Sequence, residues 1–209
     1  SNGVRIRTDS QCQSDAYLRP MLPPGKLRSD EIKTTLQLLA QNGVQRVFTS
    51  AIRSQEQSFF RDIGFELHEE LLLLSHDLSA QIPAPTHPTR RAQRSDWPHI
   101  LGIDASAFSQ FWQFDAISLT EAIKATPRSR VRVNTGPSPQ GFAITGRSGR
   151  QGFLQRLAVH PIHQGSGLGR ALVADALRWL QKRRVYEVLV NTQTENVTAL
   201  ELYKSTGFV

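Results

Sequence analysis

The sequence has few of the features on which secreted, cysteine-rich and membrane-spanning proteins depend. It contains a single cysteine, Cys12, among 209 residues, which excludes an internal disulfide and a cysteine-rich metal site and suits a reducing compartment. No apolar run, Leu71–Leu74 included, is longer than about four residues, far short of the roughly 20 residues that a membrane-spanning helix needs. No basic segment followed by an apolar stretch opens the chain, so we expect no signal peptide, no membrane contact and a cytoplasmic protein.

The six histidines carry no clear metal-ligand spacing. The closest pair, His160 and His163, flanks a proline and precedes a glycine-rich turn, which is more typical of a surface loop than of a ligand pair. The sequence therefore predicts no metal site.

The charge is positive overall and unevenly distributed. The formal net charge is +7, yet residues 1–82 carry 9 Lys and Arg against 10 Asp and Glu, which gives −1. Residues 83–99 carry 3 against 1, and residues 100–209 carry 13 against 7, which gives +2 and +6. Basicity in the second half suits a polyanionic cofactor or an ordinary soluble surface. A nucleic-acid partner ranks below both, because no Lys- and Arg-rich block interleaved with aromatic residues is present.

A proline-rich segment divides the chain. Four prolines fall between Gln81 and Pro98, where apolar residues are few. Because proline fixes φ and removes a backbone donor, this composition favours a linker over a helix or an inner strand. We therefore predict a first domain over residues 1–82, a linker over 83–99 and a second domain over 100–209.

Hydrophobic periodicity and turn residues predict alternating helices and strands on both sides of the linker. In the first domain we expect a helix over 29–42, a strand over 44–49, a helix over 55–62 and one or two strands over 65–76. In the second we expect helices over 104–108, 118–125, 168–184 and 196–205, and strands over 130–134, 141–145, 152–159 and 186–192.

One segment of the second domain carries recognisable chemistry. From Leu157 to Arg170 a strand runs into a glycine-rich turn, and a helix begins at once. Amides in the first turn of a helix have no internal partner, and the helix dipole adds positive potential there, so this turn predicts an anion site. Gly165, Gly167 and Gly169 let the backbone approach a phosphate closely, and the Arg170 guanidinium adds a charged donor. The predicted ligand is a pyrophosphate.

Other phosphate-binding folds fit this segment less well. A Walker-type loop needs a lysine followed by serine or threonine, which is missing here. A dinucleotide fold would place an acidic residue at the end of the next strand, and none is present. A plain tight turn between a strand and a helix is the remaining structural alternative.

Two motifs together resemble the GCN5-related N-acetyltransferase (GNAT) family. The run Gln164-Gly-Ser-Gly-Leu-Gly169 matches the family signature Gln/Arg-x-x-Gly-x-Gly/Ala at every fixed position. The second motif, which begins at Asn196 and ends at Gly207-Phe208, follows in the expected order and at the expected separation. The resemblance covers residues 152–208 and extends more weakly back to about Ile100. It implies an α/β (α+β) GNAT fold, in which helices flank a mixed, mostly antiparallel central sheet.

The resemblance also implies a role for each matching position. Leu157, Ala158 and Val159 would present their backbone to the pantetheine arm of acetyl-CoA, and Asn196 would hydrogen-bond the same arm. Tyr203 would also contact the cofactor and, as general acid, would protonate the leaving thiolate of coenzyme A. The pyrophosphate would be held by the turn and the start of the helix, namely by Gln164, Gly165, Ser166, Gly167, Leu168, Gly169 and Arg170. A packed core tyrosine and a helix N-cap are the structural alternatives for Tyr203 and Asn196.

The general base departs from the family pattern. The branch that this chain most resembles, the ribosomal-protein alanine acetyltransferases, has a glutamate on the strand before the second motif. The corresponding residue here is Asn191, which cannot accept a proton. A water chain, Glu195 or His160 would then take the proton of the amine, or the acceptor differs from that of the branch.

The first half contains a degenerate copy of the second motif, at an offset of 143 residues. Phe60 stands where the later copy has Tyr203, and Arg53 stands where it has Asn196. Pro23 and Pro24 fall where the phosphate-binding turn would be, and proline has no N–H to offer. We interpret residues 1–82 as a partial, non-catalytic GNAT-like unit; a chance match is the alternative.

The leading hypothesis is transfer of an acetyl group from acetyl-CoA to a primary amine. A protein N-terminal amine and a small-molecule amine are both open as acceptors. A non-enzymatic acyl-CoA-binding regulatory module and a nucleic-acid binder are the alternatives from other classes. A homodimer is also open.

Overall fold

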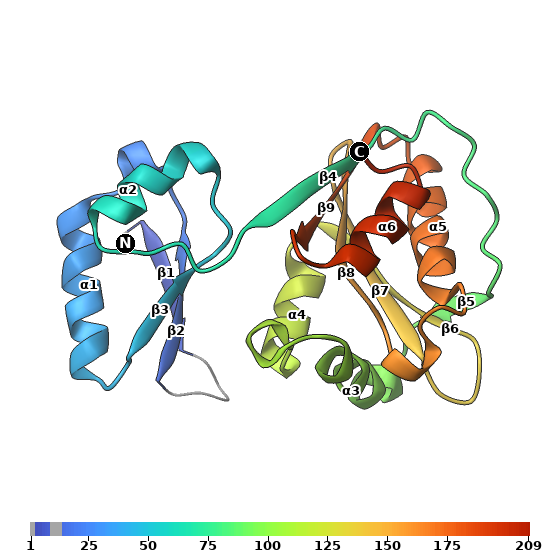
Figure 1. Cartoon of the computed structure of the whole chain (residues 1–209), viewed down its shortest axis with the longest axis horizontal. Helices are drawn as coiled ribbons and strands as arrows, with labels where there is room; N and C mark the ends of the chain where they lie inside the picture. The colour runs from blue at the N-terminus through green and yellow to red at the C-terminus, as the bar shows by residue number, and fades with distance from the viewer. Residues whose placement is uncertain (1–2, 9–13) are drawn as a thin grey trace. The chain divides into compact units, whose positions relative to one another are not determined.

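The computed structural model describes residues 3–8 and 14–209 (Figure 1). Cys12 lies outside the described residues. The chain forms two compact units, Ser1–Glu70 and Leu71–Val209. No helix among the described residues is long and apolar enough to cross a membrane.

The first unit is a small sheet with two helices. Its elements are β1 Val4–Thr8, β2 Asp15–Pro20, η1 Pro24–Lys26, α1 Ser29–Gln41, β3 Arg46–Thr49, η2 Ser54–Glu56 and α2 Gln57–Asp62. The strand order is β1-β2-β3, with β1 antiparallel and β3 parallel to β2. Leu18 of β2, Ile32 of α1 and Phe60 of α2 are almost fully buried and form its core.

The second unit is built on a six-stranded sheet in the order β4-β9-β8-β7-β6-β5. Its strands are β4 Leu71–His76, β5 Thr89–Arg91, β6 Arg128–Asn134, β7 Gly141–Ser148, β8 Gln151–Val159 and β9 Glu187–Gln193. Its helices are η3 Arg94–Asp96, α3 Trp97–Ala107, η4 Gln110–Trp112, α4 Ala116–Lys124, η5 Pro161–His163, α5 Leu168–Gln181 and α6 Val197–Ser205. Only β8 and β9 pair in parallel, which confirms the predicted α/β (α+β) fold with a mixed, mostly antiparallel sheet flanked by helices.

Two hydrophobic cores cover the two faces of this sheet. On one face α5 contributes Leu172, Leu177 and Leu180, which pack with Tyr203 and Phe208 around α6. On the other face α3 and α4 pack against β6, β7 and the end of β8. Apolar residues at helical spacing along α5 explain this burial, because one side of that helix faces the sheet throughout.

Most expected elements form within a few residues of their predicted bounds, and the exceptions lie around the expected linker. The prediction of strand over 65–70 is wrong, because only Leu71–His76 of that stretch pairs, with β9. Residues 83–99 were expected to be unstructured, but Thr89–Arg91 pairs with β6 and α3 begins at Trp97. Pro98 is accommodated because it falls in the first turn of a helix, where its missing N–H costs nothing.

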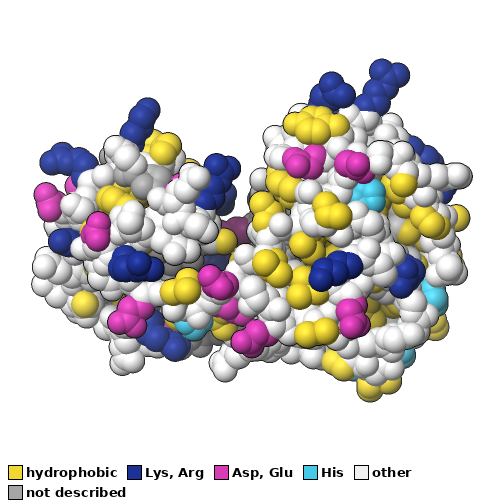
Figure 2. Space-filling view, turned by 45° about the horizontal axis from the view of Figure 1, so that its top comes forward, with side chains coloured by type: hydrophobic (Ala, Val, Ile, Leu, Met, Phe, Trp, Pro, Cys, Tyr) yellow, Lys and Arg dark blue, Asp and Glu magenta, His cyan; other side chains and the backbone are white. Residues whose placement is uncertain are grey.

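Charged side chains are dispersed over the face drawn in Figure 2. Lys and Arg occur on both units and are interrupted by Asp, Glu and hydrophobic side chains. On neither unit, taken by itself, does the surface drawn there show a continuous basic stripe of the kind that tracks a nucleic-acid backbone.

Candidate functional site

The turn between β8 and α5 has the backbone conformation that its glycines predict. Gly165 and Gly167 have φ values of 74° and 87°, in the left-handed region that residues with a Cβ avoid. Gly167 is the N-cap residue of α5, and the first α5 bond runs from the Ala171 N–H to its carbonyl at 3.0 Å. The two glycines therefore allow the sharp reversal from strand to helix.

The turn presents a row of amides without internal partners. Within the described part of the chain, the N–H groups of residues 165–170 have no recorded hydrogen-bond acceptor. Residues 164–167 are exposed, so a ligand can reach them from solvent. Unpaired amides at the start of a 14-residue helix are groups that can hold an anion.

The side chains of this segment support the turn. The Gln164 amide donates to the Val159 carbonyl at 3.1 Å, and the Ser166 hydroxyl donates to the His163 carbonyl at 2.7 Å. Leu168 is 2% exposed and anchors the helix in the core, so only its backbone is available to a ligand.

Two further residues meet the C-terminal half of α6. A Cβ on Gly169 would lie 3.2 Å from a methyl carbon of Leu202, which explains why this position is small. The exposed Arg170 donates to the Ser205 carbonyl at 3.3 Å. A groove of about 290 Å³ opens beside Arg170, between α5 and residues 82–86.

Strands β8 and β9 separate beside this turn. Their parallel pairing ends at Phe153 and Leu189, although β8 continues to Val159 and β9 to Gln193. A β-bulge interrupts the β7–β8 register at the same level and leaves Gln155 as the extra residue. Bulges bend the strand that carries them, so the bulge accounts for the divergence of β8 from β9.

The divergent end of β8 is the segment from which backbone contacts to the cofactor were expected. Leu157 and Val159 pack toward α5 and α6, whereas Ala158 packs toward α3 and α4. Since these side chains are used in packing, the backbone edge facing the gap is the part available to a ligand.

Helix α6 carries the other two expected residues. Asn196 caps the helix, and its Oδ1 accepts from the Ala199 N–H at 3.1 Å. The structural alternative for Asn196 is thus realised, while its NH₂ group makes no recorded bond among the described residues. Tyr203 is 6% exposed beside Phe208, with ring centroids 5.5 Å apart. Burial raises the pKa of Tyr203 to about 12, and the nearby Arg156 charge partly opposes that rise.

None of the three residues considered around the base is buried. Asn191 lies on β9 and pairs with Leu73 of β4; it comes after Leu189, the last β9 residue that pairs with β8, and it is exposed. Glu195 is exposed immediately before the α6 cap. His160 is half-buried, and its Nδ1 accepts from the Ile162 N–H at 3.4 Å. No group of three or more metal-ligating side chains occurs in the described ranges 3–8 and 14–209.

Sequence reasoning missed one feature at this site, an ion pair between Arg156 and Asp104. Arg156 directly precedes the Leu157–Val159 segment, and Asp104 is fully buried on α3. A charged residue within a buried strand, together with an aspartate inside an apolar helix, was the available signal.

Curated proteins of known activity resemble this chain over different lengths. A mycothiol acetyltransferase of Acidothermus cellulolyticus is 28% identical over 82% of this chain and 61% of its own length. A ribosomal-protein alanine N-acetyltransferase of Escherichia coli is 39% identical, but only over 32% of this chain and 45% of its own length. The chain spans between 51% and 61% of the length of three mycothiol acetyltransferases that it matches.

A solved structure and a family model agree with the fold. A tandem GNAT protein from the clavulanic acid biosynthesis pathway superimposes with a TM-score of 0.66 over 93% of this chain and 71% of its own, at 14% identity. Residues 93–208, more than half of the chain, match the model of the Acetyltransferase (GNAT) family. The glycine turn, the separated strands and this match together show that the chain belongs to the acetyltransferase (GNAT) family.

Proposed function

We propose that this chain transfers the acetyl group of acetyl-CoA to a primary amine. The observation that carries the proposal is the row of unpaired amides at residues 165–170, which lies beside the separated ends of β8 and β9. One ligand that combines a diphosphate with a long, hydrogen-bonding arm would occupy both features.

The residues present fit coenzyme A in their chemistry. The amides from Gly165 to Arg170 suit the pyrophosphate, and the exposed Arg170 guanidinium adds a charged donor. The backbone edge of Leu157–Val159 suits the amides of the pantetheine arm, which would lie along it like an added strand. The Asn196 NH₂ group is a further donor for that arm.

The proposed reaction is a direct transfer between two substrates. A neutral amine attacks the thioester carbonyl, so that a C–N bond forms and the C–S bond breaks. The thiolate takes a proton from the Tyr203 hydroxyl, and the proton of the amine leaves to a base. With a pKa of about 12 the Tyr203 hydroxyl is protonated at neutral pH, as a general acid must be, although the rise makes it a weaker acid than a free tyrosine.

The group that takes the proton of the amine is proposed from the residues near the gap between β8 and β9. Since Asn191 cannot accept a proton, a water chain, Glu195 or His160 would take the proton of the amine. An amine of low pKa is already neutral when it binds and has only one proton to lose during the transfer, which favours amines such as peptide N-termini, whose pKa is about 8.

The acceptor is a protein N-terminal amine or a small-molecule amine. The similarity to the alanine N-acetyltransferase supports the first, but it covers only 32% of this chain. The similarity to the mycothiol acetyltransferase covers 82% and includes part of the first unit, which favours a small-molecule acceptor as the second candidate.

We further propose that the first unit is a non-catalytic, GNAT-like partner of the catalytic unit. The offset of 143 residues that aligns Phe60 with Tyr203 also aligns Phe65 with Phe208. The likeness to a tandem GNAT protein over 93% of the chain supports such an arrangement.

Calorimetry with coenzyme A at low ionic strength, followed by an amine screen, tests the proposal. We expect heat of binding and then release of free thiol from acetyl-CoA with at least one amine. The panel contains alanine-leading peptides, polyamines and small amino compounds. Absence of binding heat would end the enzymatic interpretation, whereas binding without thiol release would favour the acyl-CoA-binding module.

A further inference from the structure

A buried ion pair joins β8 to α3 next to the proposed reaction centre. The Arg156 guanidinium donates from Nε to Oδ2 of Asp104 at 2.7 Å and from Nη2 to Oδ1 at 2.9 Å. The Asp104 side chain is 0% exposed and that of Arg156 is 10% exposed. Buried pairs of this kind give little net stability compared with apolar residues of similar size, so stability does not explain this one.

The pair holds one particular segment, residues 104–114. Arg156 also donates to the Trp112 carbonyl at 2.5 Å, and Asp104 accepts from the Phe114 N–H at 2.7 Å. These bonds tie the end of α3, the short helix η4 and the approach to α4 to a single side chain of β8.

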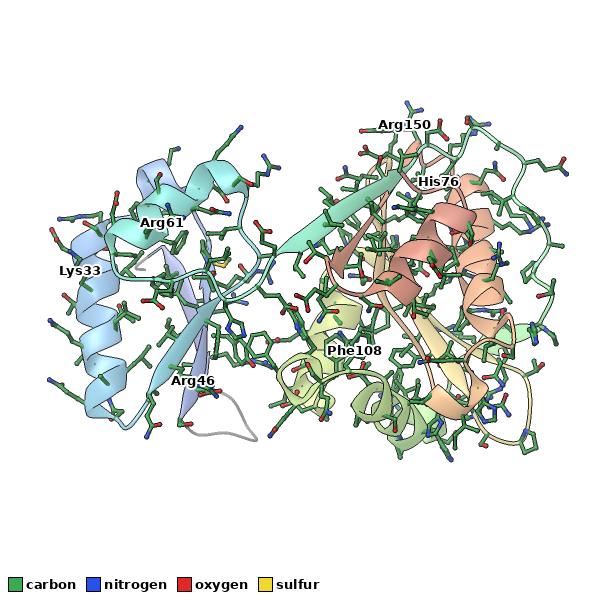
Figure 3. The ribbon with its side chains drawn as sticks, viewed as in Figure 1. Lys33, Arg46, Arg61, His76, Phe108 and Arg150 are labelled. Carbon is green, nitrogen blue, oxygen red and sulfur yellow. The ribbon has the colours of Figure 1, made fainter. Side chains whose placement is uncertain are left out.

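Two aromatic rings complete the arrangement. The guanidinium carbon of Arg156 lies 3.4 Å from the ring centroid of Phe108, labelled in Figure 3, and 4.0 Å from that of Phe114. Stacking against both rings needs the flat guanidinium group, which lysine lacks. The segment is therefore fixed in orientation as well as in position.

The bulge at Gln155 places the Arg156–Asp104 ion pair beside the gap between β8 and β9. Gln155 bonds the Ala122 carbonyl of α4 at 2.9 Å, and Arg156 bonds α3, so two consecutive side chains face the same side of the sheet. The next residue, Leu157, begins the segment proposed to hold pantetheine. Helices α5 and α6 cover one face of the sheet and residues 104–114 lie on the other, which is the side on which we place the approaching amine.

We propose that Arg156 is a positioning residue that, locked by Asp104, holds residues 104–114 as one wall of the acceptor site. This inference rests on the proposed function. Arg156 does not touch the reacting atoms, so its loss changes recognition of the acceptor and leaves recognition of acetyl-CoA intact.

Three variants separate positioning from stability. Arg156→Met leaves a buried, unpaired Asp104 and lowers the melting temperature. The double variant Arg156→Met with Asp104→Leu removes both charges and recovers the melting temperature, because apolar residues replace buried pairs well. Arg156→Lys keeps the charge but loses the two-pronged bond and the stacking.

Steady-state kinetics use acetyl-CoA and the amine that releases thiol fastest in the screen. In the double variant we expect the KM of the amine to rise about tenfold or more, with the KM of acetyl-CoA within about twofold of the wild-type value. Arg156→Lys should give an intermediate KM for the amine. An unchanged amine KM in the double variant, or an equal rise for both substrates, overturns the inference.

Hydrogen exchange provides a second measurement that needs no activity. The Phe114 amide bonds Asp104, so it should be protected in the wild type and should exchange about tenfold faster in Arg156→Lys. Equal protection in both proteins contradicts the positioning role. If the wild-type protein acetylates no amine, the proposed function fails while this measurement still decides whether the pair orders the segment.

Discussion

The two units share an order of elements but differ in the features that the proposed chemistry needs. The series β2–η1–α1–β3–α2 in the first unit corresponds to β8–η5–α5–β9–α6 in the second. In both, the two strands pair in parallel. Each series also ends on a left-handed glycine, Gly64 with φ 96° and Gly207 with φ 94°. Each aromatic that follows donates its amide to the carbonyl five residues earlier at 3.0 Å.

The two units differ in the turn before the long helix, in the separation of the two parallel strands and in the residue at the position of Tyr203. Before α1 the chain carries Pro23 and Pro24, and Gly25 does not take the left-handed conformation of Gly165 and Gly167. Strands β2 and β3 stay paired to the end of β3, and the Ser50 amide extends the ladder to the Leu18 carbonyl. Phe60 occupies the core position that corresponds to Tyr203.

The comparison separates the residues used in packing from those proposed to bind the ligand. The aromatic core and the left-handed glycine occur in both units, because each unit must end a short helix against a sheet. The left-handed glycines of the turn, the strand gap and the hydroxyl at the position of Tyr203 occur in the second unit and not in the described residues of the first.

Tyr203→Phe makes the second unit resemble the first at the position of the proposed acid. Because the hydroxyl would no longer protonate the leaving thiolate, we expect kcat to fall by roughly 10²- to 10⁴-fold. The Kd for coenzyme A should stay unchanged, since the turn and the strand gap are untouched. Single-turnover thiol release and calorimetry measure the two quantities.

Phe60→Tyr is the matched control for that substitution. Phe60 is 2% exposed, so an added hydroxyl should lower the stability of the first unit and leave kcat at the wild-type value. If Tyr203→Phe retains full activity, another donor protonates the thiolate, and the two units do not differ in the acid.

The sequence predicted the features that a short stretch of neighbouring residues specifies by itself. The long apolar face of α5, the glycine turn before it and the Asn196 cap were each evident from local pattern. The mixed sheet flanked by helices followed from the resemblance, and the structure confirms it.

Features that depend on pairing between distant segments could not be predicted in this way. The bulge at Gln155 and the end of β8–β9 pairing depend on register, which the residues of one strand do not fix. The partners Arg156 and Asp104 lie 52 positions apart, so no local period connects them. Strand β5 was hidden by prolines, because an edge strand tolerates neighbours that an inner strand does not.

The buried hydroxyl of Tyr203 predicts a loss of stability at alkaline pH. The folded-state pKa of about 12 lies above the unfolded value of 10.0, so this stabilisation is complete below pH 10 and is lost as the pH rises to 12. The difference amounts to about 3 kcal/mol at most. Tyr203→Phe should remove this part of the pH dependence.

Urea unfolding followed by tryptophan fluorescence at pH 8 and pH 11 measures this effect. All three tryptophans, Trp97, Trp112 and Trp179, lie in the second unit, so the signal reports on the unit that contains Tyr203. The difference between wild type and variant cancels the other titrating groups. Parallel losses of stability in the two proteins would show that the hydroxyl does not resist ionisation.

The smallest expected effect concerns two glycines with the same backbone conformation in different units. Gly43 ends α1 and Gly167 begins α5, and both have φ 87°. Alanine costs roughly 1–2 kcal/mol in this region, and neither position places a new Cβ closer than 3.5 Å to another atom in the structure. Gly43→Ala and Gly167→Ala therefore carry the same intrinsic strain, and any difference between them arises from location.

We expect Gly167→Ala to raise the Kd for coenzyme A about tenfold, because relief of the strain rotates amides away from the phosphate. Gly43→Ala should lower stability by a similar amount and leave the Kd unchanged. Calorimetry and urea unfolding on both variants give the comparison. If both variants weakened binding equally, general loosening would be the cause and the turn would lose its special role. If neither did, the amides after β8 would not be the groups that bind the diphosphate, and the contrast between the two units would rest on the strand gap and the Tyr203 hydroxyl.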